Sequence, residues 1–350
     1  MPRLTRRAVA ATAAALAAAA ATPALPGTAV NASAVRTLGK NGPKVSAVGL
    51  GCNNFGMTLD AAGTERVVHA AVDFGITLFD TADVYGRGVS EEYLGKALGV
   101  RRKNVLIATK FGSPMGIGKF PNGGGKRDAI MALAEESLRR LGTDYIDLYQ
   151  IHRPDPSTPQ EETLRALDDL VRQGKVRFIG HSNFDGAMTV EAAKIAAKNN
   201  LTPYISAQNH YSLLTRDIEK DLVPSVVAHG LGILPYFPLE SGLLTGKYKR
   251  GEKPAEGTRM ANWSSRAPQA TERFLNDQKF AKVEQLQALG EAHGVTLLQM
   301  AFGWLLNRPY ISSVIAGATK PEQIESNVKA AAWRPAPDLE REIDRITTPA

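Results

Sequence analysis

The sequence predicts an α/β fold of the (β/α)8 TIM barrel type, in a single domain with an N-terminal β-hairpin plug. From Val35 onward, short apolar runs alternate with amphipathic stretches in eight successive βα units. No Gly-x-Gly-x-x-Gly motif opens any expected helix, which argues against the alternative of a doubly wound dinucleotide-binding sheet. The length of 350 residues and the hydrophobic fraction of 43% suit one domain with a sizeable core.

The first half of the barrel is marked by apolar runs and helix-boundary residues. A hairpin turning at Asn41-Gly42 is expected to close the bottom of the barrel. Expected strands begin at Val45, Ile76, Val105 and Ile146, and expected helices cover 64–75, 90–98, 127–141 and 158–174. Ser90 and Thr158 stand where N-cap residues are favoured.

The second half continues the same alternation. Expected strands begin at Val176, Ile205, Leu231 and Ile311, and expected helices cover 184–199, 217–229, 274–293, 297–307 and 320–331. Between Gly242 and Pro268 lies a long insertion with many charges, prolines and glycines. We expect this insertion to follow the seventh strand.

The first 34 residues differ from the barrel in composition. Arg6 and Arg7 precede a run of almost pure alanine, and residues 32–34 are small, as a signal peptidase requires. This segment resembles a twin-arginine (Tat) signal, which implies the Tat export machinery as a partner and a periplasmic or secreted mature chain of residues 35–350. The alternatives are an alanine-rich extension or an uncleaved anchor. Alanine is too weakly apolar for a stable span, which needs roughly 20 strongly apolar residues.

Charge and cysteine content exclude several classes of function. Removing the first 34 residues takes away three arginines and lowers the net charge from +7 to +4. No Lys/Arg stripe with interleaved aromatic residues appears, so no nucleic-acid partner is predicted. The single cysteine, Cys52, forbids an intramolecular disulfide and is expected in the core. No His-x-x-x-His or Cys-x-x-Cys pair is present, so no metal site is predicted.

Four polar residues fall at the carboxyl ends of neighbouring strands, where barrel enzymes place their chemistry. Asp80 and Tyr85 follow the second strand, Lys110 ends the third and His152 ends the fourth. An ammonium group beside a tyrosine lowers the pKa of the phenol, and a buried lysine stays charged only beside a carboxylate. A histidine can hydrogen-bond the substrate oxygen or relay a proton. Such a site can polarise a carbonyl and protonate the resulting alkoxide, but it needs a hydride donor.

These residues also carry a family resemblance. The segments "FDTADVYG", "ATKFG", "LYQIHRPDP", "GHSNF", "LLTGKY" and "VIAGATKPEQIESN" resemble, in order and spacing, the motifs of the aldo-keto reductases. The resemblance implies interconversion of small-molecule aldehydes or ketones and alcohols by hydride transfer. It makes Tyr85 the general acid/base, Lys110 its pKa tuner, Asp80 the counter-ion and His152 the substrate-orienting partner. Asp83, in the same segment, is expected to be a solvent or loop contact.

The resemblance further implies an NADP(H) cofactor across the barrel mouth. Ser182, Asn183 and Gln208 would bind the nicotinamide amide, and Tyr236 would stack on its ring. The implied pyrophosphate residues are Leu239, Gly242, Leu244 and Lys247, and the implied adenosine residues are Gly317, Thr319, Lys320, Gln323 and Asn327. Gln323 replaces an arginine that many members use for the 2′-phosphate. Lys320 can supply that charge instead, so NADP is favoured over NAD.

One residue departs from the family pattern, and two other functions stay open. Glu240 stands where the family usually has a small residue, which places a carboxylate near the expected pyrophosphate. A regulatory protein with bound cofactor and slow turnover, as in the potassium-channel β subunits, would keep the same four residues. A glycoside hydrolase would need Asp80 paired with Asp155 or Glu240, and Lys110 beside Asp80 makes that unfavourable.

Overall fold

The computed structural model describes residues 33–113, 124–266 and 268–348. The expected export signal covers residues 1–34, so all but its last two residues lie outside the described part of the chain. Ser33 and Ala34 themselves hydrogen-bond to the start of the barrel. The Val48 amide donates to Ser33 Oγ (3.1 Å) and the Ala47 amide donates to the Ala34 carbonyl (2.6 Å). The last two residues of the expected signal therefore contact the barrel.

Eight parallel strands form one sheet in the order β10-β3-β4-β5-β6-β7-β8-β9. The strands are β3 (Val48–Gly51), β4 (Leu78–Asp80), β5 (Leu106–Phe111), β6 (Ile146–Ile151), β7 (Val176–Ser182), β8 (Ser206–Gln208), β9 (Gly232–Ile233) and β10 (Val314–Gly317). The ends of this order meet, because the Ile233 amide donates to Tyr310 O (2.8 Å) and the Ser312 amide donates to Ile233 O (2.9 Å). The predicted (β/α)8 barrel is confirmed.

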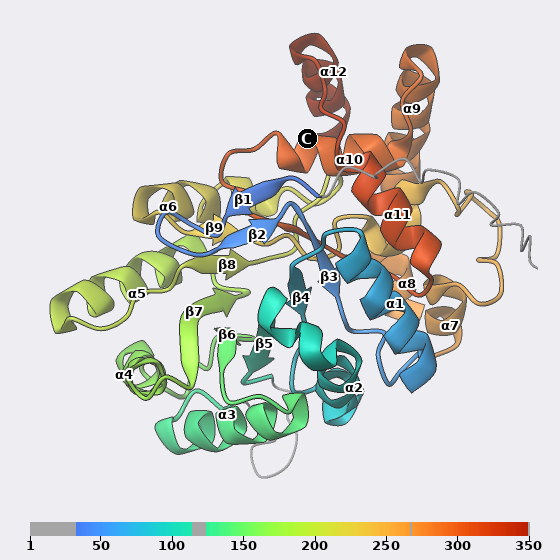
Figure 1. Cartoon of the computed structure of the whole chain (residues 1–350). Coiled ribbons are helices and arrows are strands. Elements are labelled where there is room, and N and C mark those ends of the chain that lie inside the picture. The colour runs from blue at the N-terminus through green and yellow to red at the C-terminus, as the bar shows by residue number, and fades with distance from the viewer. Residues whose placement is uncertain (1–32, 114–123, 267, 349–350) are drawn as a thin grey trace, which may run out of the picture. The chain divides into compact units, whose positions relative to one another are not determined.

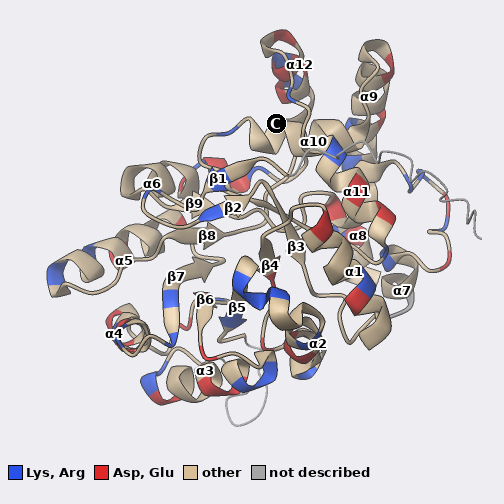
Figure 2. Ribbon diagram, in the orientation of Figure 1, with Lys and Arg blue, Asp and Glu red and all other residues tan. Residues whose placement is uncertain are grey.

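Helices surround the strands, as Figure 1 shows. They are α1 (Ala61–Asp73), α2 (Val89–Leu98), α3 (Arg127–Leu141), α4 (Gln160–Arg172), α5 (Gly186–Asn199), α6 (Leu222–His229), α7 (Arg259–Arg266), α8 (Pro268–Phe274), α9 (Asp277–His293), α10 (Leu297–Leu306), α11 (Pro321–Ala330) and α12 (Pro337–Thr347). Most charged residues lie on these helices, and few lie on the central strands (Figure 2). None of the described helices is both long and apolar enough to cross a membrane.

The predicted hairpin is also present, as antiparallel strands β1 (Val35–Thr37) and β2 (Lys44–Ser46). Leu38 and Val45 from the hairpin pack in one buried cluster with Leu78 and Leu106, the first residues of β4 and β5. The hairpin therefore closes the amino ends of the strands and leaves their carboxyl ends open for a site.

Two predicted N-caps are wrong, and the structure shows the reason. Helix α2 starts one residue before Ser90, whose hydroxyl is buried and donates to Cys52 O (2.9 Å). Helix α4 has no side-chain cap, because Thr158 Oγ1 donates to the Asp155 carboxylate (3.0 Å) instead. For Ser90 a tertiary partner takes the hydroxyl, and for Thr158 a residue three positions earlier in the same loop takes it, so neither hydroxyl is left to cap its helix.

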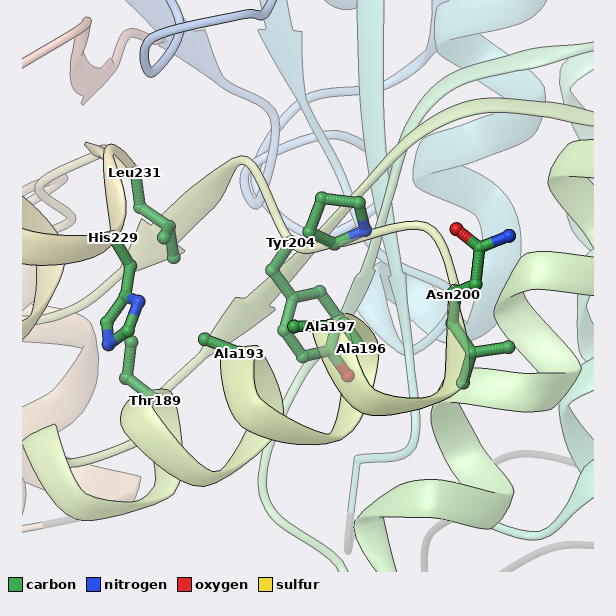
Figure 3. Close-up of a pocket in the computed structure, with 10 residues that line it drawn as sticks. Thr189, Ala193, Ala196, Ala197, Asn200, Tyr204, His229 and Leu231 are labelled. Carbon is green, nitrogen blue, oxygen red and sulfur yellow. The ribbon is translucent and has the colours of Figure 1, made fainter.

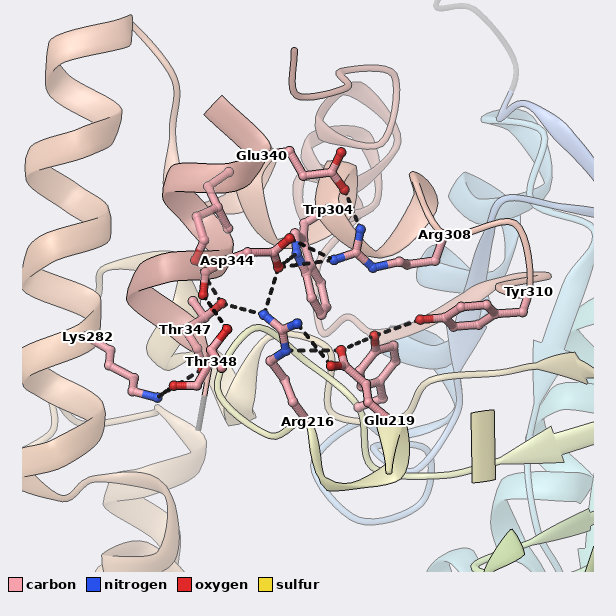
Figure 4. A network of polar contacts seen from close by, with 12 residues as sticks. Arg216, Glu219, Lys282, Trp304, Arg308, Tyr310, Glu340, Asp344, Thr347 and Thr348 are labelled. Carbon is pink, nitrogen blue, oxygen red and sulfur yellow. Dashed lines mark hydrogen bonds and ion pairs between the residues drawn. The ribbon is translucent and has the colours of Figure 1, made fainter. Parts of the chain in front are cut away.

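The C-terminal helix α12 is fastened to the barrel by a network of ion pairs (Figure 4). Asp344 Oδ1 accepts hydrogen bonds from Arg216 Nη1 (2.7 Å), Trp304 Nε1 (2.9 Å) and Arg308 Nη2 (3.1 Å). Arg216 also pairs with Glu219 in the loop after β8. One carboxylate on α12 thus ties α10 to a loop that borders the carboxyl ends of the strands.

We predict that Asp344→Ala lowers the free energy of unfolding by about 2–3 kcal/mol, because two guanidinium groups and an indole N–H lose their shared acceptor. Glu342→Ala on the same helix removes only an exposed pair with Arg345 and should change stability by less than about 0.5 kcal/mol. Urea unfolding measures both variants. Equal losses would show that the network does not stabilise the fold.

Candidate active site

The centre of the site is a buried ion pair between Asp80, the last residue of β4, and Lys110 on β5. Lys110 Nζ lies 2.7 Å from Asp80 Oδ2 and also donates to Thr81 O (2.8 Å). The other carboxylate oxygen, Asp80 Oδ1, accepts from Gln208 Nε2 (2.8 Å) and from Gln150 Nε2 (3.4 Å). Burial acts to lower the pKa of Lys110, but Asp80 and Tyr85 outweigh burial and raise it above its usual value. Lys110 is therefore charged inside the barrel.

Tyr85 begins a tight turn whose next residues adopt left-handed backbone angles. The 310 helix η1 (Tyr85–Gly88) contains three consecutive left-handed residues, Gly86 (φ 57°), Arg87 (φ 56°) and Gly88 (φ 91°). This turn puts the Tyr85 ring centroid 5.1 Å from Lys110 Nζ. Burial raises the pKa of Tyr85, while Lys110 opposes the rise without reversing it. Lys110 thus acts in the expected direction, but burial outweighs it, and Tyr85 is a protonated phenol at neutral pH.

His152 directly follows β6 and lies edge-on to Tyr85, with ring centroids 5.9 Å apart. Burial, followed by the charges of Lys110 and Arg153, lowers the pKa of His152 to about 3. Its buried Nδ1 atom has no hydrogen-bond partner among the described residues. The imidazole is thus neutral at physiological pH and has a free ring nitrogen.

A second group of charges lies behind Tyr85. Asp83 is 1% exposed, not the solvent or loop contact that the sequence suggested, and its Oδ1 has no partner among the described residues. Arg140 pairs with Glu91 (2.6 Å), and its charge, like that of Lys110, acts on Asp83 only from a distance. Burial, and then the negative charge of Glu91, raise the pKa of Asp83 to about 7. Asp83 therefore changes its charge near neutral pH, two residues from Tyr85.

The three residues expected at the nicotinamide amide and Tyr236, expected on its ring, form one connected group. Ser182 Oγ donates to Gln208 O (2.8 Å), and Asn183 Nδ2 donates to Ser182 Oγ (3.0 Å). Tyr236 OH donates to Asn183 Oδ1 (2.8 Å), which fixes the Tyr236 ring near the ends of β7 and β8. Tyr236 lies beyond β9, which ends at Ile233, and not at the end of the strand itself.

The residues expected at the pyrophosphate lie in the 310 helix η4 (Glu240–Thr245) and just before and after it. A side chain at Gly242 would lie 2.6 Å from Lys247 Nζ, so the ammonium group sits directly over the glycine backbone. Leu239 O accepts from the amides of Gly242 (2.8 Å) and Leu244 (3.2 Å). Ser241, which the sequence did not single out, has a buried hydroxyl with no partner among the described residues. An unpaired hydroxyl next in sequence to a glycine whose backbone lies under an ammonium group fits a phosphate group.

The residues expected at the adenosine end gather where β10 meets α11. Gly317 pairs with Gly51, which pairs in turn with Asp80, so this end lies two strands from the ion pair. Gln323 Oε1 accepts from the Thr319 amide (2.7 Å). Lys320 is exposed at the N-cap position of α11, and Asn327 is 5% exposed on the same helix. The structure thus brings every sequence-predicted site residue to one end of the barrel, but their roles stay predictions.

Arg259 on α7 is a further candidate that the sequence did not reveal. Its Nη2 atom donates to Asn54 Oδ1 (3.2 Å), and its guanidinium carbon lies 5.8 Å from the Trp263 ring centroid. Burial lowers the pKa of Arg259, and no carboxylate pairs with it among the described residues. A guanidinium group without a counter-ion at the barrel mouth suits an anionic ligand. Nothing in the composition of the insertion distinguishes this arginine from the others.

A pocket of about 290 Å³ lies elsewhere, between α5 and the segment that follows α6 (Figure 3). Its lining includes Ala193, Ala196, Tyr204 and Leu231 on the outside of the barrel. None of the predicted site residues lines it, so the strand ends remain the candidate active site.

We predict that Lys110→Met costs about 3–5 kcal/mol of unfolding free energy, because it leaves the Asp80 carboxylate buried without its cation. The double variant Asp80→Asn/Lys110→Met should recover most of this loss. Urea unfolding of the single and double variants measures the coupling. If both are destabilised equally, the ion pair does not constrain the barrel.

Asp83→Asn should stabilise the protein by about 2–4 kcal/mol at about pH 8, and the gain should disappear near pH 4. The folded-state pKa of about 7 lies above the unfolded value. Ionised Asp83 therefore costs stability, and the cost develops as pH rises from about 4 to 7. Urea unfolding across this range is the measurement. Asp168→Asn is the contrasting control, because hydrogen bonds from Thr202 lower the pKa of Asp168 against the effect of its burial. It should lose stability at about pH 8.

Comparisons with known proteins agree with this geometry. The model of the aldo/keto reductase family matches residues 47–347. The chain is 39% identical over 322 residues to a putative voltage-gated potassium channel subunit beta of Schizosaccharomyces pombe, covering 89% of this chain and 92% of that protein. It is 33% identical over 303 residues to the L-glyceraldehyde 3-phosphate reductase of Escherichia coli K12, covering 84% and 86%. An uncharacterized oxidoreductase, YrpG of Bacillus subtilis, is 36% identical over 88% of this chain and 93% of its own. The chain belongs to the aldo/keto reductase family.

Proposed function

We propose that this protein is an NADP(H)-dependent oxidoreductase that interconverts small-molecule aldehydes or ketones and alcohols. The observation that carries the proposal is the charged Lys110–Asp80 pair, placed under a protonated Tyr85 at the carboxyl ends of the strands. Membership of the aldo/keto reductase family, and relatives named as oxidoreductases, support this class of reaction.

The pKa values favour Tyr85 over His152 as the proton donor. The Tyr85 phenol is protonated at neutral pH, whereas His152, with a pKa of about 3, is a neutral imidazole without the acidic imidazolium proton. When Tyr85 donates its proton to the substrate oxygen, Lys110 stabilises the phenolate that remains. His152 can orient that oxygen through its free ring nitrogen. In the reverse direction Tyr85 takes the proton back.

The chain's own residues fit a dinucleotide, which would supply the hydride. Ser182, Asn183 and Gln208 offer amide and hydroxyl groups beside Tyr236. At the phosphates, Ser241 and Lys247 offer an unpaired hydroxyl and an ammonium group. Lys320 is an exposed cation that could bind a 2′-phosphate. Gln323 is uncharged, and its Oε1 atom already accepts from the Thr319 amide. We therefore propose NADP(H) before NAD(H).

A second function, cofactor-dependent regulation with slow turnover, is favoured by the 39% identity to a protein named as a putative potassium channel subunit beta. The same active-site residues would serve it, so only the turnover rate separates the two. Export by the Tat machinery also stays a proposal, which rests on the first 34 residues of the sequence. An exported reductase of this kind would have to leave the cytoplasm with its cofactor bound.

The test is fluorescence titration with NADPH and NADH, followed by turnover on a panel of aldehydes that includes L-glyceraldehyde 3-phosphate. We predict that Tyr85→Phe lowers kcat by about 10²–10⁴-fold, the contribution of a general acid. Its Kd for NADPH should stay within about threefold, a change below 1 kcal/mol. Tyr93→Phe, on helix α2, is the matched control and should leave kcat and Kd unchanged.

Each outcome separates the candidates. Tight binding with turnover that depends on Tyr85 supports the reductase. Binding with negligible turnover on every aldehyde favours the regulatory function. Absence of binding to either dinucleotide contradicts both.

A further inference from the structure

We propose that Glu240 is a positioning residue, whose buried carboxylate holds both the phosphate-binding turn and the Tyr236 ring in place for the dinucleotide. The inference rests on the proposed function and adds to it a residue that lies where a carboxylate would be expected to repel the cofactor. The proposal is carried by the backbone of the turn, by the contacts of the carboxylate and by the stacking of His210.

The turn after β9 has a backbone that L-amino acids disfavour. Left-handed φ angles occur at Phe237 (50°), Glu240 (47°), Ser241 (55°) and Gly242 (102°). Three of these four residues carry a side chain, so the conformation persists only where its surroundings hold it. The same turn contains Ser241, whose buried hydroxyl has no partner among the described residues, and it places the Gly242 backbone beside Lys247. Whatever holds the turn therefore shapes the proposed phosphate site.

The Glu240 carboxylate is the anchor. It is fully buried, and its Oε1 atom accepts from His210 Nε2 (2.8 Å), Ser212 Oγ (2.6 Å) and Thr215 Oγ1 (2.9 Å). Its Oε2 atom accepts from Lys279 Nζ. Burial acts to raise the pKa of Glu240, but His210 and Lys279 hold it at about 2. An ionised side chain thus fastens the turn to the loop after β8 and to α9.

The anchor extends to the proposed nicotinamide side through His210. The His210 ring stacks on Tyr236, with centroids 5.5 Å apart and planes 19° apart. His210 Nδ1 lies 3.3 Å from Arg273 Nη2, which can only donate, so the ring proton is on Nε2 and points at Glu240. Tyr236 is then held on one side by His210 and at its hydroxyl by Asn183. One carboxylate therefore orients two parts of the proposed cofactor site.

The ion pair with Lys279 explains why the Glu240 carboxylate is tolerated beside the proposed phosphate site. Lys279 neutralises the Glu240 carboxylate directly, and Oε1 of Glu240 accepts from His210 and Ser212. Removing Lys279 would leave a negative charge next to the proposed anion site, which disfavours the phosphate. Removing the charge of Glu240 at the same time would relieve that repulsion.

The test is NADPH titration of the full chain with matched variants. We expect Glu240→Ala to raise the Kd for NADPH at least about tenfold, and Glu240→Gln, which keeps an acceptor oxygen, by less than about threefold. Once saturated with NADPH, both should keep kcat within about threefold of the wild type, because neither touches the reacting atoms. Asp147→Asn is the control, a 5%-exposed acid paired with Arg102 at the starts of β5 and β6. It should lower stability without changing the Kd.

A second pair of variants, which removes the two charges one after the other, keeps the test decisive if Glu240→Ala does not fold. Lys279→Met should raise the Kd at least about tenfold, and Glu240→Gln/Lys279→Met should restore it to within about threefold. A wild-type Kd in Glu240→Ala or in Lys279→Met overturns this proposal and leaves the proposed function intact. Failure of the wild type to bind NADPH overturns the proposed function, and this inference with it.

Discussion

The buried ion pair between Lys110 and Asp80 is the constraint on which the rest of the site depends. A charged lysine inside a barrel is costly unless a carboxylate and further hydrogen bonds compensate it. Asp80 compensates it and is itself held by amides from two other strands, Gln150 and Gln208. Four strands are thus tied together at their carboxyl ends by one charge pair. The pair also gives the adjacent Tyr85 a cation that can stabilise its phenolate.

Around this fixed centre, the ligand-facing parts are built from turns with unusual backbones. Tyr85 projects from three successive left-handed residues, and Ser241 and Gly242 lie in a second left-handed turn. Such turns are stable only when neighbouring side chains hold them. Arg140, whose Cδ atom lies 2.7 Å from a side-chain position at Gly88, packs against the first turn, and Glu240 anchors the second. Two buried charged residues outside the predicted site thus maintain the shape of its mouth.

The sequence predicts the barrel well because its alternation of strands and helices depends on local apolar patterns. It also predicts which polar side chains gather at the strand ends, to within one residue: Asp80 ends β4, Lys110 is the penultimate residue of β5, and His152 directly follows β6. The sequence could not predict the net pKa of Tyr85, because burial depends on the packing of distant segments and outweighs Lys110. Arg259 could not be predicted for a similar reason. The insertion that contains it has no periodic pattern from which a position at the barrel mouth could be inferred. The prediction of Ser90 as an N-cap failed because its hydroxyl donates to a tertiary partner, the Cys52 carbonyl.

Hydride transfer from a dinucleotide to a carbonyl at this site can be followed in a single-turnover reaction. The full chain is mixed with NADPH deuterated at C4 of the nicotinamide and with an aldehyde that the enzyme turns over. We predict that the deuterium appears on the carbinol carbon of the alcohol and that the transfer is slower than with unlabelled NADPH. Alcohol formed without deuterium from either C4 position, or cofactor that is bound but never oxidised, would contradict it.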